Sequence, residues 1–201
     1  MSNKIWEFTG ETKIYFGVTL RRIRAAVEFK LKCGIVIVKG ELGGWVEKES
    51  NLYGNAWVSG DAKVYGDAKV YGNAWVYGDA RVSGNAWVSG NAWVYGNAEV
   101  SDDAWVTGNA WVYGNAEVSG NARVSGNARV KSSKDYCVYK NTWSSFRWFT
   151  YTKSDKMWSV GCFHGTGEEL IAKAYNDSEK SGKCYKAVVK AQEAIENVME
   201  E

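Results

Sequence analysis

Two residues in the last quarter of the chain have side chains that could do chemistry at a useful spacing. Cys162 and His164 stand two positions apart in a strand-like segment, so both side chains would lie on one side of the strand. A thiol beside an imidazole can act as a nucleophile and its base. The competing interpretation is a buried structural cysteine with a histidine on the surface. We favour this second interpretation, so the residues predict no catalytic site.

The same pair could also join another cysteine in a zinc site. The chain has four cysteines, Cys33, Cys137, Cys162 and Cys184. Their spacings do not match those typical of zinc sites, and Gly165–Gly167 lacks the Lys and the spacing of a phosphate loop, so we predict no metal and no cofactor. Without a CxxC motif or an apolar leader, the sequence predicts reduced thiols and a cytoplasmic protein. No stretch reaches the roughly 18 apolar residues that span a bilayer, so no membrane partner is expected.

A six-residue repeat forms the largest part of the structure that must position these residues. From Gly54 to Lys131 the pattern Gly, Asn/Asp, Ala, x, Val and a variable sixth residue runs thirteen times without an insertion, and Asp102 alone replaces the Gly. Ala and Val share one face of a strand, and the Gly supplies a corner with positive φ. Three hexads would close a triangular coil with Ala and Val inside. Val46 and Leu52 keep this frame, which predicts a parallel β-helix of about five coils over residues 42–131, roughly 24 Å long.

Every third hexad should lie on the same face of the helix, because one coil then takes 18 residues. The outward x positions of the first face are Trp57, Trp75, Trp93, Trp111 and Arg129, with Tyr77, Tyr95 and Tyr113 beside them. Those of the second face are Lys63, Arg81, Glu99 and Glu117. Those of the third face are Lys69, Trp87, Trp105 and Arg123.

These three columns predict different roles for the faces. The aromatic first face is larger than a soluble monomer normally exposes, so its Trp and Tyr residues are our candidate oligomer interface. A ligand surface, or rings that only stack on each other and stiffen the rod, are the alternatives. The third face places cations beside Trp rings, which suits cation–π contacts, so its four residues are candidates for binding a ligand or partner.

Residues 1–41 are predicted to form a small β cap, which an open end of a β-helix requires. Its expected strands are Ile5–Phe8, Lys13–Val18 and Thr19–Phe29. The one tight basic cluster of the chain is Arg21, Arg22 and Arg24. These arginines are either solvated charges at a strand edge, which we favour, or a contact for an anion or phosphate.

Residues 132–201 are predicted to form an α+β module. Its expected antiparallel strands are Tyr136–Tyr139, Ser145–Thr152 and Met157–Phe163. A capping box at Thr166–Glu169 predicts a helix to about Tyr175. A second helix, near Gly182 to Glu200, carries a broad apolar stripe made of Tyr185, Val188, Val189, Ala194, Ile195 and Val198.

The repeat resembles the hexapeptide-repeat family of left-handed β-helices. The entry segment Leu42–Leu52 and the run Gly161–Thr166, followed by Glu169, resemble a mostly uncharacterised group of such proteins from bacteria and tailed phages. The resemblance implies a left-handed coil, a homotrimer and an acyltransferase-like label. Two features depart from the group. Val160 stands where a second cysteine is common, and the helix after Gly161–Thr166 lacks the group's usual histidine.

Acyltransferases of this fold use a histidine on a coil, whereas these thirteen hexads contain no His, no Cys and no inserted loop. Our preferred function is therefore a non-catalytic, oligomeric binding or scaffold protein. The resemblance to phage proteins implies an anti-defence role, on a host factor or by sequestering a small anionic, nucleotide-like signal. An acyl-CoA-dependent acyltransferase with His164 as base, and a phage structural accessory protein, are the alternatives. The net charge of +2, without a basic stripe, argues against nucleic acid as a partner.

Overall fold

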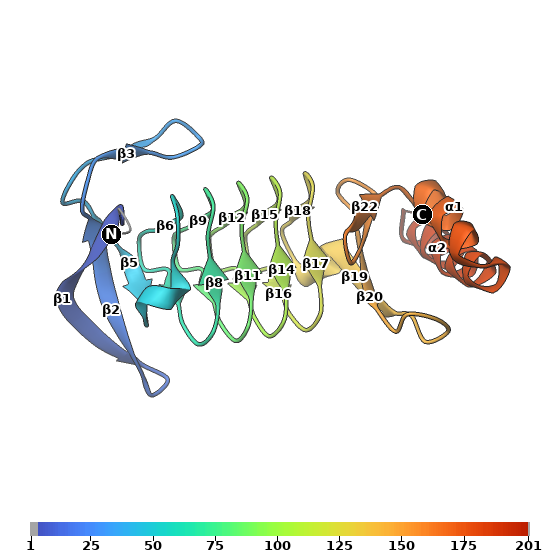
Figure 1. Cartoon of the computed structure of the whole chain (residues 1–201), viewed down its shortest axis with the longest axis horizontal. Coiled ribbons are helices and arrows are strands. Elements are labelled where there is room, and N and C mark those ends of the chain that lie inside the picture. Colours follow the sequence, from blue (N-terminus) through green and yellow to red (C-terminus); the bar gives the residue numbers. More distant parts are fainter. Residues whose placement is uncertain (1–3, 201) are drawn as a thin grey trace.

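The computed structural model describes residues 4–200 as three parts along one elongated molecule. An N-terminal cap, a column of stacked coils and a C-terminal module follow each other from left to right in Figure 1. Within residues 4–200, no helix has the length and apolar character needed to cross a membrane.

The stacked coils form a parallel β-solenoid with three faces. The first face consists of β6 (Trp57–Val58), β9 (Trp75–Val76), β12 (Trp93–Val94), β15 (Trp111–Val112) and β18 (Arg129–Val130). The second consists of β5 (Leu42–Val46), β7 (Lys63–Val64), β10 (Arg81–Val82), β13 (Glu99–Val100) and β16 (Glu117–Val118). The third consists of β8 (Lys69–Val70), β11 (Trp87–Val88), β14 (Trp105–Val106) and β17 (Arg123–Val124). These sheets confirm the predicted parallel solenoid of about five coils and the three columns of x residues.

The inward positions of the thirteen hexads are filled by the repeated Ala and Val residues. Every Ala and Val of the thirteen hexads has no exposed surface. In the first ten hexads, the backbone N–H of the x residue donates to the Ala carbonyl of the next coil, as Trp93 N does to Ala110 O at 2.9 Å. The corners are tight. Gly90 has a φ of +68°, and a Cβ there would lie 2.9 Å from the backbone N and O of Gly108. Glycine at this corner is therefore required by both conformation and space.

The solenoid begins where the sequence frame predicted. Trp45 and Val46 pair in parallel with Lys63 and Val64, and an isolated bridge joins Leu52 to Val70. A short 3₁₀ helix, η1 (Glu49–Asn51), lies between these two rungs. The buried side chain of Asn51 donates to the carbonyls of Gly66 and Ala68, which holds this irregular segment to the next coil.

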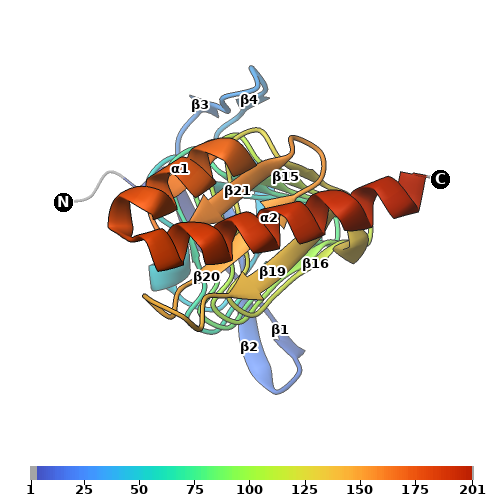
Figure 2. The ribbon, with the colours of Figure 1, turned by 90° about the vertical axis from the view of Figure 1, so that its right-hand side faces the viewer.

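The N-terminal cap consists of two hairpins that project beyond the outline of the solenoid in Figures 1 and 2. The long hairpin pairs β1 (Trp6–Tyr15) with β2 (Val18–Ala25), and β2 also pairs with β5. The short hairpin pairs β3 (Phe29–Lys30) with β4 (Val36–Ile37). The two predicted N-terminal strands are one strand with a bulge between Phe8 and Thr12, and the next strand ends at Ala25 rather than at Phe29.

At the other end, hydroxyl groups close the last coil. The backbone N–H of Arg123 donates to Thr150 Oγ1 at 2.8 Å, and that of Arg129 donates to Ser154 Oγ at 2.7 Å. The N–H of Glu117 donates to Ser133 Oγ at 3.3 Å. These three amides occupy the positions that pair with the next coil elsewhere in the solenoid. The module therefore supplies one acceptor for each face, which pairs these three amides where the stacking stops.

The C-terminal module has four antiparallel strands and two helices, as predicted in outline. After η2 (Ser133–Asp135) come β19 (Tyr136–Lys140), β20 (Trp148–Thr152), β21 (Met157–Val160), β22 (Phe163–Gly165), α1 (Gly167–Asp177) and α2 (Glu179–Glu200). The predicted strand Met157–Phe163 is split into β21 and β22 by a turn at Gly161, which has a φ of +58°. The capping box at Thr166 is confirmed.

Helix α2 buries only part of the predicted apolar stripe. Tyr185 and Val189 are buried in the module, whereas Ile195 is 49% exposed and Val198 is 72% exposed. Figure 2 shows the reason, because the last turns of α2 extend past the strands and α1 toward the C-terminus.

Candidate functional site

The structure brings His164 to two serines rather than to Cys162. His164 Nδ1 lies 2.9 Å from Ser125 Oγ and 3.1 Å from Ser159 Oγ, and the two hydroxyl oxygens are 2.7 Å apart. Cys162 lies in the turn between β21 and β22 as an exposed free thiol. The expectation of a buried cysteine was therefore wrong, because the turn at Gly161 removes Cys162 from the strand.

This cluster of Ser125, Ser159 and His164 joins the module to the last coil. The imidazole packs on the corner at Gly126, where a Cβ would lie 2.2 Å from His164 Nε2. In the part of the chain that the structure describes, no carboxylate contacts the ring, so the third member of a serine–histidine–acid triad is missing. Ser125 and His164 are 39 positions apart, and nothing in the sequence signals their contact.

The cysteines and histidine do not form a metal cluster. Among the residues described, no group of three or more His, Cys, Asp or Glu side chains is arranged to hold a metal ion. Burial raises the pKa of the Cys137 thiol, which makes this cysteine a weaker ligand and nucleophile than an ordinary one.

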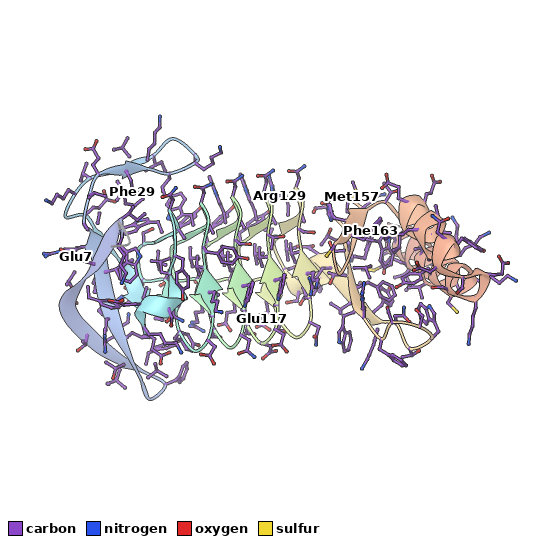
Figure 3. The ribbon with its side chains drawn as sticks, viewed as in Figure 1. Glu7, Phe29, Glu117, Arg129, Met157 and Phe163 are labelled. Carbon is purple, nitrogen blue, oxygen red and sulfur yellow. The ribbon has the colours of Figure 1, made fainter. Side chains whose placement is uncertain are left out.

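On the first face the aromatic rings form two parallel ladders. Trp93 and Trp111 stack with centroids 4.8 Å apart and planes 1° apart, and Tyr77 stacks on Tyr95 at 4.8 Å and 3°. This spacing is too short for coplanar rings side by side, so these stacked rings turn their faces toward each other and mainly their edges outward. Trp75 differs, because its plane is 77° from that of Trp93. Figure 3 labels Arg129 on the last rung, where its guanidinium covers the Trp111 ring at 3.9 Å.

Burial within the Tyr ladder raises the pKa of one phenol. Mainly by desolvation, with a smaller contribution from Tyr95, the pKa of Tyr77 is raised to about 12.

Trp57 has no exposed surface, because Phe29 of the cap packs on its ring at a centroid distance of 5.3 Å. The prediction that Trp57 contributes to an oligomer interface was therefore wrong.

The third face carries a second ladder with a cation at each end. Trp87 and Trp105 stack at 4.8 Å, with planes 4° apart. Lys69 Nζ lies 5.2 Å from the Trp87 ring centroid, and the Arg123 guanidinium lies 4.2 Å from that of Trp105. The structure thus brings all four predicted residues together, and each cation covers an outer ring face.

By contrast, the arginines of the N-terminal cap do not form one site. Arg24 Nε pairs with Glu7 at 2.7 Å, and Arg22 Nε donates to the Gly43 carbonyl at 3.2 Å. The Arg21 guanidinium lies over the Phe8 ring at 5.3 Å. Each guanidinium has its own partner, so the anion contact proposed for this cluster is not assembled.

A cleft of about 310 Å³ lies where the third face meets the C-terminal module, and only two of its seven lining residues were predicted as site residues from the sequence. Its lining residues are Asp103, Trp105, Asn121, Arg123, Arg147, Trp148 and Gly161. Trp105 and Arg123 were predicted from the repeat. Trp148 is the first residue of β20 and Arg147 directly precedes it, and only the docking of the module against the last coils brings them here.

Comparison with known protein families matches the YdcK β-solenoid repeat at residues 74–90, 80–96 and 116–132. All three matches begin and end within the parallel strands and corners described above or directly beside them. The chain is a β-solenoid repeat protein. No curated protein matches it significantly, so the comparison describes the repeat and not the two ends of this β-solenoid protein.

Proposed function

We propose that this protein is a non-catalytic, oligomeric scaffold in which a stiff solenoid separates two contact-forming ends. One observation carries the proposal. Within residues 4–200, the most exposed large apolar side chains all lie outside the thirteen hexads. They are Ile14, Phe16, Val27, Ile35, Val36, Val38, Leu42, Tyr53, Phe146, Tyr175, Ile195, Val198 and Met199.

The solenoid itself supports the role of a spacer. Its stacked Trp rings cover one another, and cations cover Trp87, Trp105 and Trp111, so little Trp ring face is left for a partner. The terminal elements differ, since Phe16 at the tip of the long hairpin is 82% exposed and Val198 in α2 is 72% exposed. Exposed apolar groups of this kind mark contact surfaces in soluble proteins.

Three finer statements belong to this proposal. We take the solenoid to be a hexapeptide coil, which the period of six and the three faces support, and we take its left hand from the resemblance alone. A homotrimer is the assembly typical of that family. An anti-defence role of a phage-encoded protein is the setting in which we place it, from the same resemblance.

Light scattering on the full chain tests the assembly. We expect the mass of three chains for the unmodified protein. Replacing Ile195, Val198 and Met199 together by Ser should lower the mass toward one chain, because these side chains are exposed and their loss leaves the module core intact. The matched control, Tyr95→Lys, places a cation in the middle of the first face and should keep the mass. The mass of a single chain at every concentration would contradict the scaffold, and dissociation by Tyr95→Lys alone would move the interface to the first face.

The acyltransferase alternative has one observation in its favour. His164 Nδ1 contacts Ser125 and Ser159 beside the last coil, which is where a base or nucleophile could act. Thiol release from acetyl-CoA, measured with a panel of acceptors and lost in His164→Ala, would establish this alternative and exclude the non-catalytic scaffold. We expect no thiol release above the rate without protein.

A further inference from the structure

Two guanidinium groups converge on one glycine in the cleft at the end of the third face. Arg123 Nη1 donates to the Gly161 carbonyl at 3.4 Å. Arg147 Nη1 lies 3.3 Å from the position that a Cβ on Gly161 would occupy. The two side chains come from β17 and from the residue before β20, so the fold itself holds these like charges near each other.

Neither arginine is neutralised by an ion pair within residues 4–200. Arg22, Arg24 and Arg81, in contrast, each pair with a carboxylate. The cleft contains one acidic residue, Asp103, whose Oδ1 accepts a hydrogen bond from Asn85 Nδ2 at 3.0 Å. The balance of charge in the cleft is therefore positive, and a guanidinium without a carboxylate partner is the group that best binds carboxylate or phosphate.

Two indole rings form the aromatic part of the lining. The Trp105 ring is fully engaged, because Trp87 stacks on one side and Arg123 covers it at 4.2 Å. This stacking holds the Arg123 guanidinium in one orientation, which lowers the entropy lost when it binds an anion. Trp148 has a cation near its ring, Lys140 Nζ at 5.1 Å, and contributes a half-buried indole to the cleft. A planar ring in the cleft could lie against Trp148.

We propose that this cleft binds a small aromatic anion, with its carboxylate or phosphate held by Arg123 and Arg147 and its ring against Trp148. The volume of about 310 Å³ is at the lower end of the range for ligand pockets, about 300–1,000 Å³, so a single ring system with one anionic group fits best. This site is separate from the apolar ends that carry the scaffold proposal. Light scattering tests that proposal and calorimetry tests this one.

A neighbouring cavity shares one arginine with the cleft, so substitutions of the residues that they do not share can show which of the two holds a ligand. Arg147 also lines a cavity of about 410 Å³ between the loop before β20 and the two helices, which includes Lys173, Leu170 and Tyr185 but not Arg123 or Trp148. A ligand in the proposed cleft should depend on Arg123 and Trp148. A ligand in the neighbouring cavity should depend on Lys173 instead.

Isothermal titration calorimetry on the full chain tests the site with three probes: adenosine monophosphate, benzoate and inorganic phosphate. We expect at least one ring-bearing probe to bind more tightly than phosphate. Arg147→Ala and Arg123→Ala should each weaken its binding about tenfold or more, since each removes a charged hydrogen bond. Trp148→Ala should weaken the ring-bearing probe and leave phosphate unchanged.

Matched controls separate binding from folding. Arg129→Ala removes an arginine at the same hexad position, which stacks on Trp111 as Arg123 stacks on Trp105, and should leave affinity unchanged. Arg147 is exposed, so Arg147→Ala keeps the test valid if Arg123→Ala fails to fold. The proposal is overturned if none of the probes binds the unmodified protein, if phosphate binds as tightly as the ring-bearing probes, or if Lys173→Ala weakens binding while Arg123→Ala does not.

Discussion

The solenoid and the C-terminal module differ in where their polar side chains lie, outside the core in the first and partly inside it in the second. In the solenoid, the inward positions of the thirteen hexads are only Ala and Val, and polar side chains line up outside, as Asn73 and Asn91 do at 3.2 Å. In the module, Asn141 and Gln192 are almost fully buried among large rings such as Trp158. Asn141 Nδ2 donates to the Tyr185 hydroxyl at 3.0 Å.

This difference shows how each region specifies its structure. Each coil contacts only the coils beside it, so the solenoid is stabilised by the same interaction repeated along its axis. The module depends on individual contacts between distant residues, such as the hydrogen bond that the Tyr139 hydroxyl donates to Gln192 Oε1. We therefore expect a destabilising substitution in the coils to unfold neighbouring coils along the axis, and one in the module to unfold only the module.

The largest effect should come from a charge inside the solenoid. Val94→Asp places a carboxylate at a position with no exposed surface and should lower the free energy of unfolding by about 3–5 kcal/mol. Amide hydrogen exchange measured by mass spectrometry should show lost protection in the coils on both sides. Val189→Asp, the matched change in the module, should expose α1 and α2 and leave the coils protected. If both variants lost protection everywhere, the two regions would be a single cooperative unit.

A smaller loss of stability should follow from Gly→Ala at the corners. Comparing two corners separates the cost of close coil stacking from the cost of the backbone conformation. Gly90 and Gly120 both have positive φ, +68° and +62°, but only Gly90 has the next coil against it, while nothing lies within 4 Å of a Cβ on Gly120. Gly120→Ala should cost about 1–2 kcal/mol for the left-handed conformation alone. Gly90→Ala should cost at least about 1 kcal/mol more, because its methyl group overlaps the Gly108 backbone. Equal urea midpoints for the two variants would show that close stacking does not limit the corner residue.

The smallest effect should appear at the joint between the two regions. Thr150→Val keeps the shape of a fully buried side chain but leaves the Arg123 N–H without its acceptor, which should cost about 1–2 kcal/mol. Hydrogen exchange should rise first at the third-face rung of the last coil. Thr152→Val, which removes a hydroxyl bonded to Asp155 inside the module, should leave that rung protected. Unchanged exchange at Arg123 in Thr150→Val would mean that the module does not stabilise the end of the solenoid.

The sequence by itself determined the solenoid. A period of six with Ala and Val two apart fixes which residues point inward, and the coil of 18 residues then fixes which outward residues are neighbours, as Trp93 and Trp111 are. Strand boundaries in the cap were less accurate, because the bulge between Phe8 and Thr12 depends on how β1 pairs with β2, and the end of β2 at Ala25 depends on how β2 pairs with β1 and β5. Periodicity carries no information about such pairing.

Only the tertiary structure decided what lies at the ends of the solenoid. The burial of Trp57 under Phe29, the contact of His164 with Ser125, and the convergence of Arg123 and Arg147 on Gly161 all join segments that no repeat relates. The physical reason is that a repeat defines the distance between its own members, whereas the aperiodic modules are placed by docking. Their side chains pair through contacts that form only when the cap meets the first coils and the module meets the last coil.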